Sequence, residues 1–151
     1  MRYIDSGARD PDQAVATWLE MALQPDLAEL RIQSGFFSRD ALQPLLEPLA
    51  ALAEVDAPVR VAIGSNDGGT IASHLEELVA ALQLPRANGR LGVVYFAGTF
   101  FHPKTYHVRR VDGSQAAYIG SANLTLPGIS RHVEAGILLD TREGDPEQIL
   151  D

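Results

Sequence analysis

The feature that most constrains the fold of this chain is a change of hydrophobic period near residue 85. Before that point, apolar residues recur at helical spacing in three segments separated by short apolar runs; after it, they recur at every second position. We expect helices over residues 10–24, 38–53 and 71–84, and strands over residues 30–32, 59–63, 91–96, 104–111, 116–119 and 133–139. This order predicts the α/β class, as a layered α/β/α sandwich with a mixed central sheet.

A tight turn relates two of these strands to one another. Asp112, Gly113 and Ser114 separate the runs at residues 104–111 and 116–119, which is typical of a β-hairpin. In a hairpin the two outer ends lie side by side. Residues 102–104 and 120–123 are therefore expected to meet at one edge of the sheet.

Length and composition limit the possible classes of protein. At 151 residues the chain is expected to form one domain, 1–151, with residues 141–151 as an acidic tail or the start of a further helix. The absence of cysteine excludes disulfides, thiolate metal sites and a cysteine nucleophile. The first residues lack the apolar run of a signal peptide, and no apolar stretch approaches membrane-spanning length. We therefore expect a cytoplasmic protein with no membrane partner.

Charge is distributed unevenly along the chain. The formal net charge is −8, yet residues 86–132 hold six basic residues against one acid, Asp112, a local balance of +5. The rest of the chain holds six arginines and nineteen acids. Such segregation also occurs on ordinary solvated surfaces, but here it coincides with the hairpin and favours an anionic ligand.

The two ends of the hairpin carry residues suited to phosphate chemistry. His102 stands two positions before Lys104, the only lysine of the chain. The end of the following strand offers Gly120, Ser121 and Asn123, and the next strand begins near Glu134. Either fragment alone is weak evidence, since a lone Gly-Ser-x-Asn is usually just a turn. Their occurrence in this order, at matching ends of a hairpin, indicates a single site.

In these residues the chain resembles the phospholipase D superfamily. The signature of that superfamily is His-x-Lys, four residues, an aspartate, then Gly-Ser-x-Asn, often with a glutamate downstream. Arg109 replaces the aspartate here. Loss of that aspartate is familiar in the metal-independent nuclease branch, which includes some restriction endonucleases and helicase-associated domains. The resemblance covers most of the chain and implies a phospholipase D-like fold and a hydrolase, of the nuclease or endonuclease type, that works without metal or cofactor.

The resemblance also implies a role for each motif residue. His102 would attack phosphorus and form a phosphohistidine, while Lys104, Ser121 and Asn123 would bind the phosphate oxygens. Glu134 would orient the imidazole. Because the family uses two histidines and this chain has one motif, a homodimer would bring two His102 side chains together. No metal site is expected.

Other polar residues near the motif are weaker candidates. We expect Arg109, Arg110 and Arg131 to contact nucleic acid, with DNA favoured over RNA as the partner. His107 is expected on the opposite face from His102 in a structural role, and His132 is expected either to touch substrate or to pair with Glu134. The sequence Gly64, Ser65, Asn66 echoes the later Gly-Ser turn, and we interpret it simply as a second strand ending in a turn.

Two other functions stay open at this point. The first is a phosphodiesterase of the same superfamily that cleaves a phospholipid or a small diester. The second is a non-catalytic module that binds phosphate and recognises a partner. The basic segment, and the lack of a basic amphipathic helix, favour nucleic acid over lipid. The complete set of His102, Lys104, Asn123 and Glu134 argues against a non-catalytic module.

Overall fold

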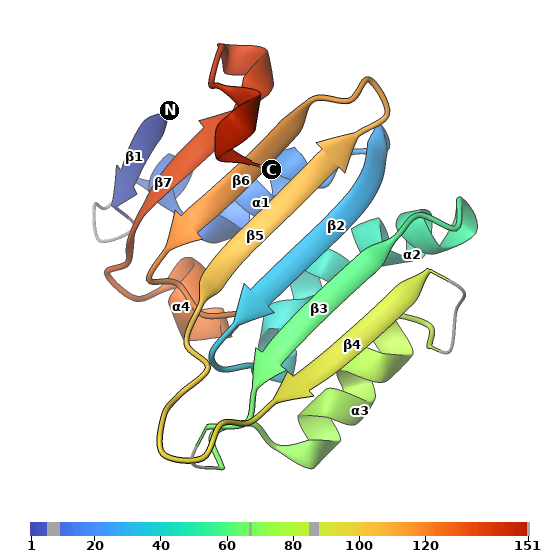
Figure 1. Ribbon diagram of the computed structural model, residues 1–151, viewed down its shortest axis with the longest axis vertical. Helices are drawn as coiled ribbons and strands as arrows, with labels where there is room; N and C mark the ends of the chain where they lie inside the picture. The colour runs from blue at the N-terminus through green and yellow to red at the C-terminus, as the bar shows by residue number, and fades with distance from the viewer. Residues whose placement is uncertain (6–9, 67, 85–87, 151) are drawn as a thin grey trace.

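A computed structural model describes residues 1–5, 10–66, 68–84 and 88–150, and its strands form one seven-stranded mixed sheet (Figure 1). The strand order is β1-β7-β6-β5-β2-β3-β4. The strands are β1 (Arg2–Asp5), β2 (Leu27–Ser34), β3 (Val59–Gly64), β4 (Gly89–Val94), β5 (Lys104–Arg110), β6 (Gln115–Gly120) and β7 (Ala135–Asp140). The neighbours β2–β3 and β3–β4 are parallel, whereas the pairs from β2 through β5, β6 and β7 to β1 are antiparallel.

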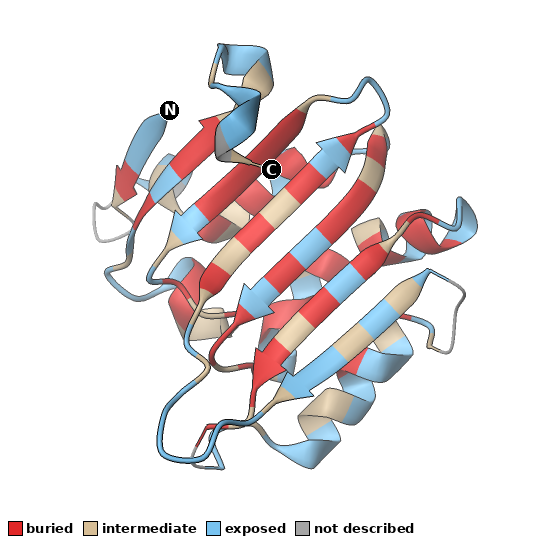
Figure 2. Cartoon of the chain, viewed as in Figure 1, coloured by how far each residue is buried: buried red, intermediate tan, exposed pale blue. Residues whose placement is uncertain are grey.

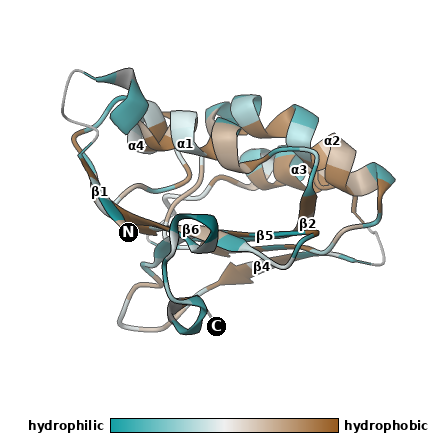
Figure 3. Ribbon diagram, turned by 90° about the horizontal axis from the view of Figure 1, so that it is seen from above, coloured by the Kyte–Doolittle hydropathy of each residue, from teal (hydrophilic) through white to brown (hydrophobic). Residues whose placement is uncertain are grey.

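The α-helices lie on one face of this sheet (Figure 3). They are α1 (Val15–Ala22), α2 (Leu46–Glu54), α3 (Ala72–Ala81) and α4 (Leu126–Ser130). The α/β class and the mixed sheet are as predicted, but the described residues form two layers rather than the expected α/β/α sandwich. The reason lies in the second half of the chain. A tight turn joins β5 to β6, and the only α-helix between β6 and β7, the short α4, lies in the same layer as the others.

Local sequence explains where the helices begin and end. The stripe Val15, Trp18, Leu19 and Ala22 is buried on α1, as the helical spacing predicts. Ahead of α2, the segment Arg39–Leu45 is a 3-10 helix that contains Pro44, because proline removes a backbone donor and disfavours a regular α-helix. The expected helix over residues 38–53 is therefore divided into a 3-10 segment and an α-helix.

The core fills the space between the sheet and the helices. Side chains along β2 alternate, with Leu30 and Ile32 buried toward the helices and Arg31 and Gln33 exposed on the other face. Figure 2 shows the same alternation of buried and exposed residues on the central strands. One face of the sheet is thus packed and the other is largely open.

The topology gathers several strand ends at one edge of the sheet. The parallel strands β2 and β3 both end there, at Ser34 and Gly64, while β5 begins there with Lys104 opposite Ser34. The hairpin predicted from Asp112, Gly113 and Ser114 is confirmed, with β5 and β6 antiparallel and Gly113 at a φ of 86°. The end of β6 consequently lies beside the start of β5.

Three segments were not anticipated or were anticipated only in part. The strand β1 and the helix α4 had no clear signal in the sequence. The expected acidic tail contains two 3-10 turns, Thr141–Glu143 and Glu147–Ile149. Between the helix expected to end at residue 84 and the strand expected to begin at residue 91, residues 85–87 lie outside the described part of the chain.

Candidate active site

His102 lies in the loop directly before β5, because that strand begins at Lys104. Its side chain is exposed, and its ring packs edge-on against Phe36, with ring centroids 5.8 Å apart and an interplanar angle of 85°. Phe36 follows the end of β2. The imidazole is therefore held from one side by an aromatic ring while it remains open to a ligand.

Lys104 is buried at the first position of β5, with only 7% of its surface exposed. Its Nζ donates a hydrogen bond of 2.9 Å to the carbonyl oxygen of His102. Burial lowers the pKa of the Lys104 ammonium, and the negative charge of Glu134 opposes that shift. A compact cation thus lies directly behind the histidine loop, with an acid close enough to act on it.

Ser121 connects the end of β6 to Glu134. Its Oγ donates a short hydrogen bond to Oε2 of Glu134 and accepts a bond of 3.0 Å from the Ala135 amide. The other carboxylate oxygen of Glu134 is 3.8 Å from Nδ1 of His132. His132 thus pairs with Glu134, which is one of the two roles expected for it. The role expected for Glu134 in orienting His102 stays a prediction.

Asn123 is tied to the segment that follows β2. Its Oδ1 accepts a hydrogen bond of 3.1 Å from the backbone amide of Phe36, the residue whose ring contacts His102. Ser34 strengthens the same connection, since its Oγ donates to the Phe36 carbonyl at 2.6 Å and accepts from the Leu124 amide at 2.8 Å. The two halves of the motif therefore meet through residues 34–36.

Two buried tyrosines hold the Ser121 turn from below. Tyr106 donates a hydrogen bond of 3.0 Å to the carbonyl of Ala122, and the Tyr118 hydroxyl accepts one of 3.2 Å from the Ala122 amide. Burial raises the pKa of Tyr106 well above its ordinary value and also raises that of Tyr118, so both stay neutral and can donate. Tyr106 shares the face of Lys104, as the strand period predicts, and packs beneath the site.

Asn66 is a site residue that the sequence interpretation missed. It is 3% exposed, and its Nδ2 donates to the carbonyls of Gly35 and Phe101 at 2.9 and 2.8 Å, while its Oδ1 accepts from the Phe101 amide at 3.2 Å. It therefore fastens the loop before His102 to the ends of β2 and β3. The signal in the sequence is the echo of the Gly-Ser turn at residues 64–66, which by itself indicates no more than a strand that ends in a turn.

Gly35 is required by close packing. A Cβ atom at this position would lie 2.8 Å from Cδ2 of His102 and 3.1 Å from the Phe101 carbonyl. Such a distance is shorter than side chains tolerate, so any other residue would displace the imidazole or the backbone beside it. Gly35 thus belongs to the support of His102.

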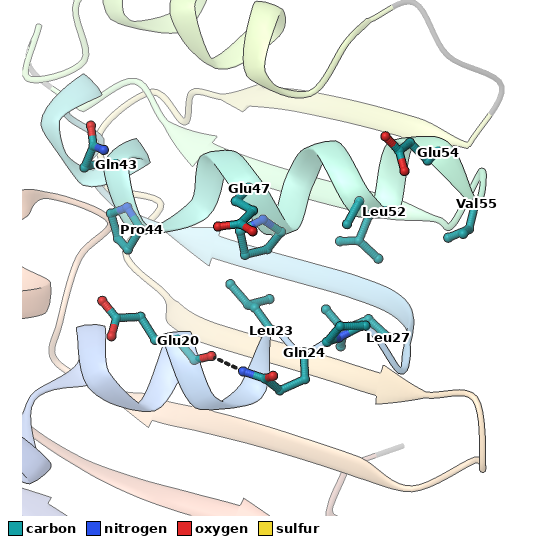
Figure 4. A pocket seen from close by; sticks show the side chains of 13 residues that line it. Glu20, Leu23, Gln24, Leu27, Gln43, Pro44, Glu47, Leu52, Glu54 and Val55 are labelled. Atoms are coloured by element: carbon teal, nitrogen blue, oxygen red, sulfur yellow. Dashed lines mark hydrogen bonds between the residues drawn. The ribbon is translucent and has the colours of Figure 1, made fainter.

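A cavity of about 540 Å³ opens beside His102. The exposed aromatic residues Tyr95, Phe96 and Phe100 line it together with Asn66 and His102 itself. A second groove, of about 650 Å³, lies between α1 and α2 and is drawn in Figure 4. Leu23 and Leu52 line that groove, but none of the motif residues does. Of these two cavities, the one beside His102 adjoins the predicted chemistry.

The three arginines expected to contact nucleic acid differ in their environment. Arg131 is exposed at the end of α4, and Arg109 is exposed on the open face of the sheet. Arg110 is not on the surface: it is 7% exposed, and its guanidinium bonds Asp140 through two contacts of 3.0 and 2.6 Å. The prediction for Arg110 is corrected, because its side chain points to the packed face and is held in an ion pair.

Arg109, which replaces the aspartate of the superfamily signature, lies far from His102. It is five residues beyond Lys104, a distance of roughly 16 Å along a strand, and its side chain points to the opposite face from Lys104. His107 points to that same open face, bonds Gln115 at 2.7 Å, and has its pKa lowered by burial. The replacement therefore leaves the motif residues untouched.

Among the residues that the structure describes, no group of three or more histidine or acidic side chains is arranged to hold a metal ion. None of the described helices is both long and apolar enough to cross a membrane.

Residues 15–150 match the family model described as the NgoFVII restriction endonuclease N-terminal PLD domain. The chain belongs to this family. Membership confirms the resemblance to the phospholipase D superfamily and makes the chain an enzyme domain of the phosphodiesterase type. No curated protein matches the chain in sequence.

Solved structures of other proteins have a similar fold. NucT from Helicobacter pylori is similar with a TM-score of 0.65 and 11% identity, over 95% of this chain and 86% of NucT. A polyphosphate kinase from Porphyromonas gingivalis has a TM-score of 0.63 and 16% identity, over 97% of this chain and 26% of the kinase. A mutant of yeast tyrosyl-DNA phosphodiesterase has a TM-score of 0.54 and 12% identity, over 92% of this chain and 32% of that enzyme. At these identities the likeness supports the PLD-like fold alone.

Proposed function

We propose that this PLD domain is a metal-independent nuclease that cleaves DNA through a phosphohistidine formed on His102. The observation that carries the proposal is the arrangement at the start of β5. An exposed imidazole stands directly before a buried ammonium, and the Gly-Ser-x-Asn turn lies at the same edge of the sheet. These are a nucleophile, a compensating cation and hydrogen-bond donors for one phosphate group.

The reaction can be written with side chains and water alone. A neutral ring nitrogen of His102 attacks phosphorus, an N–P bond forms, and the bond from phosphorus to the leaving oxygen breaks. Lys104 offsets the charge on the non-bridging oxygens, and the side-chain amide of Asn123 donates to one of them, since its oxygen is already bonded to Phe36. Water then attacks the phosphohistidine and releases the phosphate monoester.

The leaving oxygen needs a proton, and a second copy of the chain supplies it in this proposal. His102 is exposed, so a twofold partner can present the same imidazole to the opposite side of the phosphate. One imidazole attacks while the other donates a proton, and the two exchange roles for hydrolysis. Glu134, held by Ser121, orients an imidazole in the assembled site.

DNA as the substrate is supported by the family's description as a restriction endonuclease domain and by the basic balance of residues 86–132. Arg131, exposed at the end of α4, is a candidate contact to the phosphate backbone. Cleavage of a small phosphodiester by the same residues is the second candidate, because the cavity beside His102 can accept an aromatic leaving group. Both reactions depend on the same histidine.

The proposal is tested by cleavage of a plasmid in the presence of a chelator. The parent protein should cut DNA with EDTA present, and His102→Ala should lose all turnover. His74→Ala, on α3, is the control and should cut at the parental rate. A strict requirement for added magnesium, or parental cleavage by His102→Ala, would overturn the proposal.

A further inference from the structure

The open face of the sheet carries a cluster of arginines that the catalytic proposal does not use. Arg31 on β2, Arg60 on β3 and Arg109 on β5 have side chains that are 48, 52 and 50% exposed. They surround Glu29, whose side chain is 2% exposed. The described α-helices all lie on the other face (Figure 3). We refer to the three arginines as the arginine surface.

The arginines are arranged around one carboxylate. Arg31 Nε is 2.8 Å from Glu29 Oε1 and its Nη2 is 3.1 Å from Oε2, while Arg109 Nη2 is 3.1 Å from Oε2. Arg60 makes a short ion pair to Oε1. A carboxylate accepts at two oxygens, whereas each guanidinium offers five donors. The cluster therefore has a large excess of donors directed at solvent.

The cluster keeps a positive charge at neutral pH. Burial alone would raise the pKa of the Glu29 carboxyl, but the hydrogen bond from Arg31 and the charges of the three arginines outweigh it and lower that pKa. Glu29 is thus ionised, and three guanidinium groups against one carboxylate leave two positive charges. Arg90, paired in register with Arg60 on β4 and also exposed, adds a third.

Neutralising Glu29 does not explain this arrangement. One guanidinium is enough to pair with one carboxylate. The other two add positive charges, and the three guanidinium groups repel one another in the free protein. Arg31 and Arg60 are in register on adjacent strands, which lie about 4.8 Å apart. Arg109 lies opposite Glu29 on the other side of β2, so the three half-exposed guanidinium groups form a fixed group on the sheet. Such planar forks match the oxygens of phosphate diesters.

We propose that the arginine surface binds the phosphate backbone of a nucleic acid at a place separate from the catalytic centre. Arg31 is three residues before Ser34, which faces Lys104 across the β2–β5 pair, so the group is roughly 10 Å from the catalytic edge. A single nucleic acid can reach both. The identity of this ligand rests on the proposed nuclease function, whereas its anionic chemistry rests on the arginines themselves.

The direct test is binding of a fluorescein-labelled DNA duplex in a His102→Ala background, measured by anisotropy over a range of salt concentrations. Arg31→Gln and Arg60→Gln should each weaken binding about fivefold and reduce the slope of log K against log salt by about 0.9. Arg39→Gln is the matched control, because Arg39 is similarly exposed and paired with Glu77 at 3.0 Å on another element. It should change neither quantity.

A second variant separates binding from support of Glu29. Glu29→Gln removes the buried charge, keeps all three arginines and raises the net charge of the cluster by one, so it should bind DNA more tightly. If Arg31→Gln fails to fold, the double change Glu29→Gln with Arg31→Gln removes the unpaired carboxylate, and it should bind DNA less tightly than Glu29→Gln alone. Parental DNA affinity in folded Arg31→Gln or Arg60→Gln, or equal affinity in Glu29→Gln and the double variant, would overturn the proposal.

The remaining outcomes identify the occupant. Hydrolysis of bis(p-nitrophenyl) phosphate reads the catalytic centre alone and should be unchanged by Arg31→Gln in the parent protein. If the parent protein hydrolyses neither DNA nor bis(p-nitrophenyl) phosphate, the proposed nuclease function is wrong. The DNA-binding measurements still test the arginine surface independently. If the variants instead lose self-association, or binding of a polyglutamate peptide, without loss of DNA affinity, the surface recognises protein and the proposal is wrong.

Discussion

Asn66 Nδ2 donates a hydrogen bond of 2.8 Å to the carbonyl oxygen of Phe101, the residue directly before His102. Asn66 lies two residues after the end of β3, and Phe101 belongs to the loop that carries the imidazole. The bond therefore makes the position of the nucleophile depend on the parallel half of the sheet. Asn66 acts through the backbone of this loop and is a positioning residue.

We expect Asn66→Ala to lower both stability and turnover. The change leaves the carbonyls of Gly35 and Phe101 without their donor, which should reduce the free energy of unfolding by about 3 kcal/mol. Because the histidine loop loses its anchor, kcat should fall far more than KM changes. Asn88→Ala is the control, since that side chain bonds Asp56, away from the histidine loop. Urea unfolding and steady-state kinetics measure the two effects.

Gly35→Ala should displace the imidazole. The new methyl group would lie 2.8 Å from Cδ2 of His102, and relief of that contact costs about 1–3 kcal/mol. Gly92→Ala adds the same methyl group on β4, where the nearest atom is 4.0 Å away, and should leave turnover intact. Equal activity in the two variants would show that the Gly35 contact does not position His102.

The pH profile should report on Lys104. Its pKa lies below the ordinary value of 10.5 because the ammonium is buried, so the charge that stabilises phosphate is lost on raising the pH through this lowered value. We expect kcat/KM to decrease as the pH is raised, with the midpoint of this alkaline limb below pH 10.5. Glu134→Gln removes a charge that favours the ammonium and should move the limb to still lower pH. An alkaline limb that does not move in Glu134→Gln would contradict the electrostatic link between the two residues.

Arg110→Ala should affect stability rather than DNA binding. It breaks an ion pair in which Arg110 is buried and Asp140 is mostly covered, and such a loss costs about 3–5 kcal/mol. Thermal or urea unfolding measures this directly. Weakened DNA binding by a folded Arg110→Ala protein would instead restore the role that the sequence had indicated for it.

Much of the fold followed from the sequence because the hydrophobic period is strong in most elements. The strands around His102 and Lys104, and the turn at Gly113, were predicted because alternation and turn chemistry are local. The strand β1 was not predicted, since its four residues show little alternation and are fixed by pairing with β7 at the far end of the chain. The two-layer arrangement also depends on how the β6–β7 connection packs, which no local signal reveals.

Site residues were predictable where the chemistry requires a particular type of side chain. Residues that are required only by the geometry of the fold were not predictable. His102, Lys104 and Asn123 were found because few side chains can serve a phosphate. Asn66 and Gly35 support the backbone through contacts with residues 31 or more positions away along the chain, so nothing in their immediate surroundings marks them. Arg110 was misassigned because its sequence neighbours do not reveal that Asp140 lies beside it.

The most direct test of the central role of His102 is detection of its covalent intermediate. Cleavage of DNA in chelator would be quenched with alkaline detergent, which preserves phosphohistidine, and the protein digested with trypsin. Residues 91–104 form one peptide that contains a single histidine, His102. The proposed mechanism predicts a phosphoryl adduct on that histidine, absent in His102→Ala. An adduct on any other residue, or undiminished cleavage by His102→Ala, would contradict it.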